Sequence, residues 1–229
     1  MKKQSYAKYF VLTTAILAVL AMTYAQTPNA DSLKVLANRV GNYVNYIPPS
    51  SEPTYIKMDQ VTLLSTDIVI GTVLSNKCNL SPNEDFITID YVIRVDSLLK
   101  GSVSSPFTVS VPGGRVGFVD AQGNTTWAEI RSPWFKKMEN GHQYYLFLTK
   151  AGLLASKYHV VNYETTGGPQ GVFEIVNGVV KSNSGRLRDP IWQYHNMTVS
   201  SFDQLIHNLI ATQNVGPVPS PTPQIGALP

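Results

Sequence analysis

The sequence predicts a mainly β fold, an antiparallel barrel or sandwich with a helix at each end. Many short segments between residues 60 and 183 alternate apolar and polar side chains, as half-buried strands do. Turn residues separate these segments at even spacing, and no long helical pattern lies between them, which argues against a βαβ fold. We therefore expect one β domain over residues 60–213, with a C-terminal helix included.

Residues 1–25 have the pattern of a secretory signal peptide. Three lysines come before an apolar run of 13 residues, Phe10–Met22, and Ala25 provides a small residue at the expected cleavage site. The run is short for a hydrocarbon core about 30 Å thick, so a permanent anchor is the weaker interpretation. We expect cleavage after Ala25 and a secreted or periplasmic protein without a stable membrane anchor.

The chain that follows this leader has no net charge. Three of the 18 Lys and Arg residues lie in the leader, which leaves 15 against 15 Asp and Glu. No basic run is longer than Lys136-Lys137, so we expect no nucleic-acid partner. The single cysteine, Cys78, cannot form an internal disulfide. The turn-rich stretch Ser75–Pro82 predicts that Cys78 is exposed. A thiol with no role is the favoured interpretation, and intermolecular pairing or a reactive thiol is the alternative.

Residues 26–59 predict one short helix and a linker. Asp31 is a candidate N-cap. Apolar residues recur behind it at helical spacing: Leu33, Leu36, Val40 and Val44. Prolines from Pro48 onward stop regular structure before the β domain begins.

The strands of the β domain are predicted in order along the chain. Single strands are expected at residues 67–75, 86–98, 107–111, 144–149 and 158–163. Two ribbons are expected, 115–119 with 126–130 and 172–176 with 179–181. Asn177-Gly178 joins the second ribbon and fits a type I′ turn. We expect the inner face to include Ile68, Ile70, Ile89, Tyr91, Ile93, Val109, Val111, Leu146 and Leu148.

The C-terminal part of the chain divides into a helix and a tail. Residues 198–213 predict an amphipathic helix with an apolar stripe formed by Phe202, Leu205, Ile206, Leu209 and Ile210. Residues 214–229 are rich in proline and small residues, so we expect a disordered tail, with a proline-rich ligand for a partner as the alternative.

Four segments carry a resemblance to known proteins: Asp67–Val73, Leu98–Gly101, Val109–Gly117 and Gly141–Leu148. Together they resemble a group of uncharacterised exported bacterial proteins. The first two also resemble the start of the netrin/TIMP-like module, which implies an OB-type five-stranded barrel. TIMP-like inhibitors chelate a protease metal through an N-terminal disulfide-bonded cysteine, which Gln26 and the lone Cys78 cannot reproduce. The resemblance therefore implies the OB-like fold and not that inhibitory mechanism.

Residues that carry catalytic chemistry are scarce in this sequence. The four histidines show no metal-ligand spacing, and no Gly-x-Ser-x-Gly nucleophile elbow is present. We therefore predict no catalytic residue, no metal site and no cofactor. One interpretation of the glycine-rich loop Pro112–Gly117 is phosphate binding. No helix is predicted to begin after this loop, so we prefer a bulge or corner turn. Gly167–Gly171 is expected to be a turn, with ligand contact as the alternative.

Aromatic residues outside the clearly alternating strands are the strongest indication of a binding surface. Trp127, Trp134 and Trp192, together with Arg115, are the candidate contact residues for a ligand or partner. The alternative is that Trp134 and its neighbour Phe135 plug the mouth of the barrel.

These observations predict an exported, non-catalytic binding or interaction module. An envelope or extracellular protein, or a glycan, is the expected kind of partner. The alternative is a secreted hydrolase of unrecognised family, for which a cleft that gathers His142 or His159 with Asp, Glu or Ser side chains would be the sign.

Overall fold

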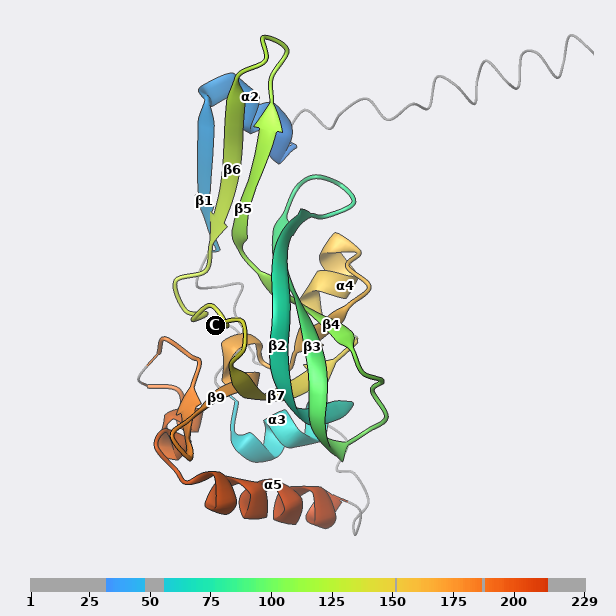
Figure 1. Cartoon of the computed structure of the whole chain (residues 1–229), viewed down its shortest axis with the longest axis vertical. Coiled ribbons are helices and arrows are strands. Elements are labelled where there is room, and N and C mark those ends of the chain that lie inside the picture. Colours follow the sequence, from blue (N-terminus) through green and yellow to red (C-terminus); the bar gives the residue numbers. More distant parts are fainter. Residues whose placement is uncertain (1–31, 48–55, 151, 187, 214–229) are drawn as a thin grey trace, which may run out of the picture.

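A computed structural model describes residues 32–47, 56–150, 152–186 and 188–213. The predicted signal peptide (1–25), the candidate cap Asp31 and the proline-rich tail (214–229) lie outside these ranges. The described chain is mainly β with helices at its periphery (Figure 1). None of the described helices is both long and apolar enough to cross a membrane.

Five strands form a ring of hydrogen bonds. In spatial order they are β7 (Gln143–Thr149), β2 (Asp67–Leu80), β3 (Ile87–Lys100), β4 (Phe107–Pro112) and β8 (Tyr163–Thr165), and β8 pairs back to β7. The strands β9 (Val172–Val176) and β10 (Val179–Ser182) extend the sheet beyond β7. The expectation of a fully antiparallel arrangement is wrong in one place within this ring, because β4 and β8 run parallel.

The long strand β2 bends around the ring at Gly71, where the pairing with β3 shifts register. A Cβ atom at this position would lie 2.5 Å from Ile93 Cγ2 and 2.9 Å from the carbonyl oxygen of Arg94. The two strands approach closely at Gly71, since only a residue without a side chain fits between them.

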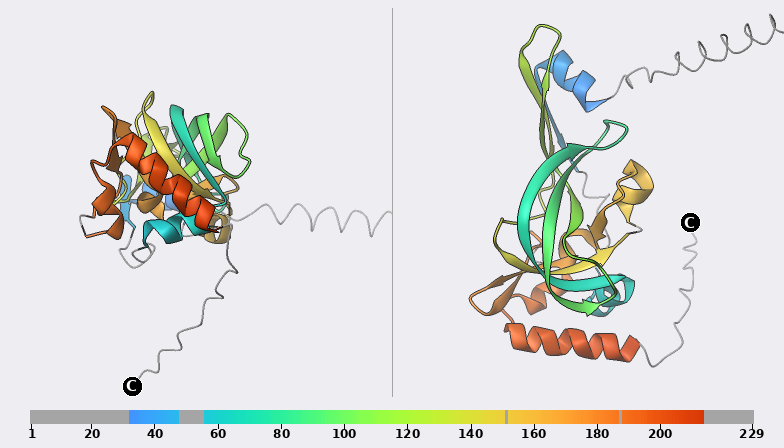
Figure 2. Two further views of the ribbon diagram at one scale, coloured as in Figure 1. Left: turned by 90° about the horizontal axis from the view of Figure 1, so that it is seen from below. Right: turned by 45° about the vertical axis from the view of Figure 1, so that its right-hand side comes forward.

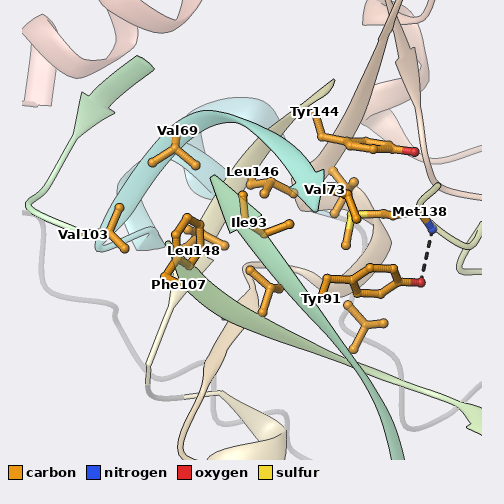
Figure 3. Packing of buried hydrophobic residues seen from close by; sticks show 13 residues of the cluster. Val69, Val73, Tyr91, Ile93, Val103, Phe107, Met138, Tyr144, Leu146 and Leu148 are labelled. Atoms are coloured by element: carbon orange, nitrogen blue, oxygen red, sulfur yellow. Dashed lines mark hydrogen bonds between the residues drawn. The ribbon is translucent and has the colours of Figure 1, made fainter. Parts of the chain in front are cut away.

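The interior of the ring is filled by a cluster of buried side chains (Figure 3). Tyr91 lies in this cluster, and its hydroxyl accepts a hydrogen bond from the backbone N–H of Met138 over 3.3 Å. Burial raises the pKa of Tyr91 above its usual range. The cluster contains Val69, Val73, Tyr91, Ile93, Val103, Phe107, Val109, Val111, Met138, Tyr144, Leu146, Leu148 and Val172, with Ile89 packed against it.

The predicted inner face is wrong at Ile68 and Ile70. Both side chains belong to a second cluster on the outer face of the sheet, while Val69 and Val73 point into the ring. The outer face of β2 is buried as well, so this strand is apolar on both sides and its sequence does not show which side is inside.

Two helices cover that outer face, α3 (Met58–Leu64) and α5 (Val199–Gln213). The predicted stripe of α5 packs as expected, with Phe202 and Ile206 fully buried. The ring of Phe202 meets Tyr145 edge-on at 4.9 Å, and the Tyr145 hydroxyl donates to Asp203 Oδ1 over 2.6 Å. The short 3₁₀ helix η3 (Pro190–Tyr194) joins this layer through Ile191.

A separate three-stranded sheet projects from one end of the ring, opposite α5 (Figures 1 and 2). Its order is β1 (Asn42–Tyr46), β6 (Thr125–Arg131) and β5 (Gly114–Val119), with β1 parallel to β6. The predicted ribbon of β5 and β6 is confirmed. Helix α2 (Leu33–Val40) packs on one face, and the side-chain oxygen of Ser32 caps it by accepting from the Val35 N–H. Val44, predicted as helical, lies in β1.

Two further elements differ from the sequence prediction. The segment expected as a strand at 158–163 instead ends helix α4 (Leu153–Tyr158), and strand β8 begins only at Tyr163. His159 adopts a left-handed backbone conformation at φ 57°, which ends this helix. Cys78 does not lie in a turn, because β2 continues to Leu80 and the half-buried thiol packs beside β5.

The hairpin of β9 and β10 is confirmed. Its turn residues Asn177 and Gly178 have φ values of 51° and 78°, both in the left-handed region that a type I′ turn requires. Between β8 and β9 the chain forms the 3₁₀ helix η2 (Gly168–Gly171), so the predicted turn at Gly167–Gly171 is a tight helical one.

Candidate functional site

A cavity of about 920 Å³ lies between the three-stranded sheet and the ring. The ends of β1 and β6 supply one wall through Tyr46, Ile47, Ile130 and Ser132. The opposite side is built by β4, β8, α4 and η2. The cavity exists because the projecting sheet leaves the ring at Pro112, where β4 ends and β5 begins.

Aromatic side chains form much of the cavity wall. Phe86 and Tyr158 both line it, and their rings stack with centroids 3.9 Å apart and an angle of 14° between planes. Phe135 and Tyr46 add two further rings. Lys157 also lines the cavity, with its Nζ 5.1 Å from the centroid of the Tyr158 ring. The wall therefore offers flat apolar surfaces suited to an organic ligand.

One buried carboxylate lines the cavity, that of Glu164 on β8. Its side chain is only 7% exposed. Oε1 accepts a hydrogen bond from the backbone N–H of Ala155 over 2.6 Å, near the start of α4. Helix α4 begins after Gly152, which has no side chain with which to cap it. Glu164 thus caps this helix from a strand nine residues later in the sequence.

Hydroxyl groups and the glycine-rich turn complete the lining. Thr149, Thr165 and Thr166 lie beside Glu164, and Thr166 accepts a hydrogen bond from Ser65 Oγ over 2.9 Å. Gly167, Gly168 and Pro169 border the same space. The turn therefore lies next to a cavity, as the alternative prediction of ligand contact requires. The sequence did not show this cavity.

The candidate contact residues Trp127 and Arg115 come together on the projecting sheet. The Arg115 guanidinium carbon lies 4.2 Å from the centroid of the Trp127 ring, and Nη2 donates to Glu129 Oε2 over 2.7 Å. Arg131 donates to the same carboxylate and lies over the Tyr46 ring. Hydrogen bonds from Arg131 and Arg115 lower the pKa of Glu129, against the opposing effect of burial. These groups occupy the face of the sheet that α2 leaves open.

Trp134 and Trp192 lie elsewhere and are more enclosed. The guanidinium of Arg186 lies 4.6 Å from the Trp134 ring centroid, and Trp192 stacks on His195 at 4.2 Å. Both indole Nε1 atoms are buried, and neither has a hydrogen-bond partner among the described residues. This enclosure favours a packing role for both rings. Neither tryptophan lines the cavity, and neither do Trp127 and Arg115.

Two comparisons of the sequence with known proteins found no match. No family model matches the chain, and no curated protein matches it.

His142 belongs to a charged network outside the cavity. Its Nδ1 lies 2.6 Å from Glu174 Oε1, and Lys136 Nζ lies 2.8 Å from Glu174 Oε2. Burial opposes ionisation of Glu174, but hydrogen bonds from Lys136 and His142 outweigh it, so the pKa is lowered. Glu139 lies 3.5 Å from His142 Nε2. Neither His142 nor His159 is among the residues that line the 920 Å³ cavity.

A smaller polar recess of about 300 Å³ lies on the outer side of β2 and β3. The carboxylate of Asp90 accepts hydrogen bonds there from Asn79, Thr88, Ser110 and Asn162. Four donors satisfy this carboxylate, so we assign it a structural role. Within the described ranges, no group of three or more His, Cys, Asp or Glu side chains is placed to hold a metal ion.

The residues of the cavity were not predicted as a site. Phe86, Glu164 and Ser132 come from three distant parts of the sequence, and none carries a local motif. The glycine-rich turn at 167–171 gave a signal of ligand contact, and Pro112 and Phe135 were singled out from the sequence for other roles. The remaining lining depends on the parallel pairing of β8 with β4, which places Glu164 opposite Ser110.

Proposed function

We propose that this protein is an exported, non-catalytic binding module whose ligand site is the 920 Å³ cavity. The volume supports this proposal, because clefts of roughly 300–1,000 Å³ with apolar walls and a few polar groups are typical of ligand sites. The lining has this composition, with four aromatic rings around one buried carboxylate. The proposal depends on this combination of cavity volume and lining.

We further propose that the ring of strands is an OB-like barrel, as the netrin/TIMP-like resemblance implies. The meander β2–β3–β4, the parallel pair of β4 with β8, and the return of β7 to β2 support it. Barrels of this kind carry recognition on loops and inserted elements. Here the inserted elements are β5–β6 and α4, and both border the cavity.

Export and a partner complete the proposal. The leader pattern at residues 1–25 supports secretion or periplasmic localisation. Trp127 and Arg115, on the open face of the projecting sheet, are the proposed contacts for an envelope or extracellular protein or a glycan. Exposed aromatic and arginine side chains are frequent at such contacts.

The experiment is to fill the cavity and measure binding. Ser132 lines the cavity and is half-buried, so Ser132→Phe would occupy part of its volume. Ser104→Phe, at an exposed position outside the cavity, is the matched control. We would titrate tryptamine, tryptophol and indole-3-propionate into each protein by isothermal calorimetry.

The proposal expects saturable binding of at least one indole probe to the wild-type protein and to Ser104→Phe. Ser132→Phe, folded by circular dichroism, should bind that probe at least about tenfold more weakly, since its ring takes the space. No saturable binding of any probe, or equal binding to both variants, would overturn the proposal.

A further inference from the structure

The hydrogen bonds of Glu164 are incomplete. Oε1 accepts from Ala155 N–H, and no described residue donates to Oε2. A carboxylate has about four lone-pair positions, and burying it with few donors is costly. Glu164 is only 7% exposed, and it borders a cavity large enough for a ligand.

Gly152 packs closely against the Glu164 carboxylate. A Cβ atom at Gly152 would lie 2.2 Å from Oε2 and 2.5 Å from Cδ. Any other residue there would have to displace the carboxylate or cover it. Gly152 and Glu164 both line the cavity, so the absence of a side chain at residue 152 lets the carboxylate lie at this part of the wall.

The aromatic wall near this carboxylate already contacts one ammonium group. Lys157 Nζ lies 5.1 Å from the centroid of the Tyr158 ring, within the distance at which a cation is attracted to the face of an aromatic ring. The charged residues of the lining are Glu164, Asp85 and Lys157, two acids and one base. Asp85 and Lys157 are exposed and opposite in charge, whereas Glu164 is buried, so the charge of Glu164 is the one that favours a cation in the cavity.

We propose that the cavity selects organic ammonium compounds, with the ammonium group at Glu164 Oε2 and an apolar or aromatic body against Phe86 and Tyr158. This inference rests on the proposed function of the cavity. An ammonium group fits better than a neutral hydroxyl, because hydrogen bonds between ionised partners are about twice as strong as neutral ones. An anionic group would be repelled by the carboxylate.

The test compares the three indole probes, which share a ring and differ in charge at the end of the side chain. Tryptamine carries an ammonium, tryptophol a hydroxyl and indole-3-propionate a carboxylate. The variant is Glu164→Gln, which removes the charge while its amide oxygen can still accept from Ala155 N–H. Asp85→Asn is the control, because Asp85 is an exposed carboxylate of the same lining.

The inference expects wild-type protein to bind tryptamine about tenfold more tightly than tryptophol, with indole-3-propionate weakest. Glu164→Gln should abolish the preference for tryptamine and leave the affinity for tryptophol within about twofold, whereas Asp85→Asn should keep the preference. Equal affinity for tryptamine and tryptophol, or a preference that survives in Glu164→Gln, would overturn the inference and leave the cavity as a binding site. Failure of all three probes would overturn both.

Discussion

Glu164 Oε1 accepts a hydrogen bond from the backbone N–H of Ala155 over 2.6 Å, joining strand β8 to the start of helix α4. This bond fixes one oxygen of the carboxylate and leaves the other at the cavity. It also makes Glu164 important for stability, apart from any role in binding.

We predict that Glu164→Leu lowers the free energy of unfolding by about 1–3 kcal/mol, because Ala155 N–H loses its acceptor in a part-buried position. Glu164→Gln should cost less, since its amide oxygen keeps the bond. Urea denaturation of the two variants gives the comparison. Equal losses would mean that the bond to Ala155 contributes little.

The interior of the ring should not tolerate a charge. Ile93 is fully buried among the ring side chains, so Ile93→Asp should cost several kcal/mol, enough to unfold a marginal domain. Leu98, on the same strand but 45% exposed, is the control, and Leu98→Asp should be nearly neutral. Thermal unfolding followed by circular dichroism measures both. An unchanged midpoint for Ile93→Asp would contradict the assigned register of β3.

Gly71→Ala should destabilise the protein, because the new Cβ would collide with Ile93 Cγ2 and the Arg94 carbonyl oxygen. We expect a loss of about 1–3 kcal/mol from this overpacking. Gly117→Ala provides the control, since the nearest atom to its Cβ would be Thr126 O at 3.8 Å, an ordinary contact. If both substitutions shift the urea midpoint equally, β2 and β3 do not approach closely at Gly71.

Acid should weaken the protein partly through Glu174. Its pKa in the folded state lies below the ordinary glutamate pKa of about 4.3, so its contribution to stability is present above that pH and is lost as the pH falls through the folded pKa. Unfolding free energies measured from about pH 7 to about pH 3 should fall more steeply for wild type than for Glu174→Gln. Parallel curves would show that the pairing with Lys136 and His142 has no net effect on stability.

The sequence predicted those elements whose signals are local. The Asn177-Gly178 turn identified the β9–β10 hairpin, and the spacing from Phe202 to Ile210 identified α5. The prediction of the inner face failed where both faces of one strand are buried, as at Ile68 and Val69. Such a strand does not alternate between apolar and polar residues, so its sequence does not show which face is inside. The bounds of strand β8 were also predicted wrongly. Tyr163–Thr165 is held by pairing with β4 and β7, which are distant in the sequence, so no local pattern marks where this strand begins.

The candidate site was predicted only in fragments. Trp127 and Arg115 do come together, because they lie on adjacent strands of a ribbon that the sequence indicated. The cavity could not be predicted, because its walls meet only after the small sheet docks beside the ring. Phe86 and Tyr158, which stack in its wall, are 72 residues apart.

The most direct measurement of the central claim is the location of a bound probe. Leu154 and Ile130 both line the cavity, on α4 and β6, and their methyl groups can be observed by NMR. The account predicts intermolecular NOEs from the indole protons of bound tryptamine to both residues, and none to the exposed methyl groups of Leu98. NOEs confined to surface methyl groups, or none to Leu154 and Ile130 at saturation, would contradict the account.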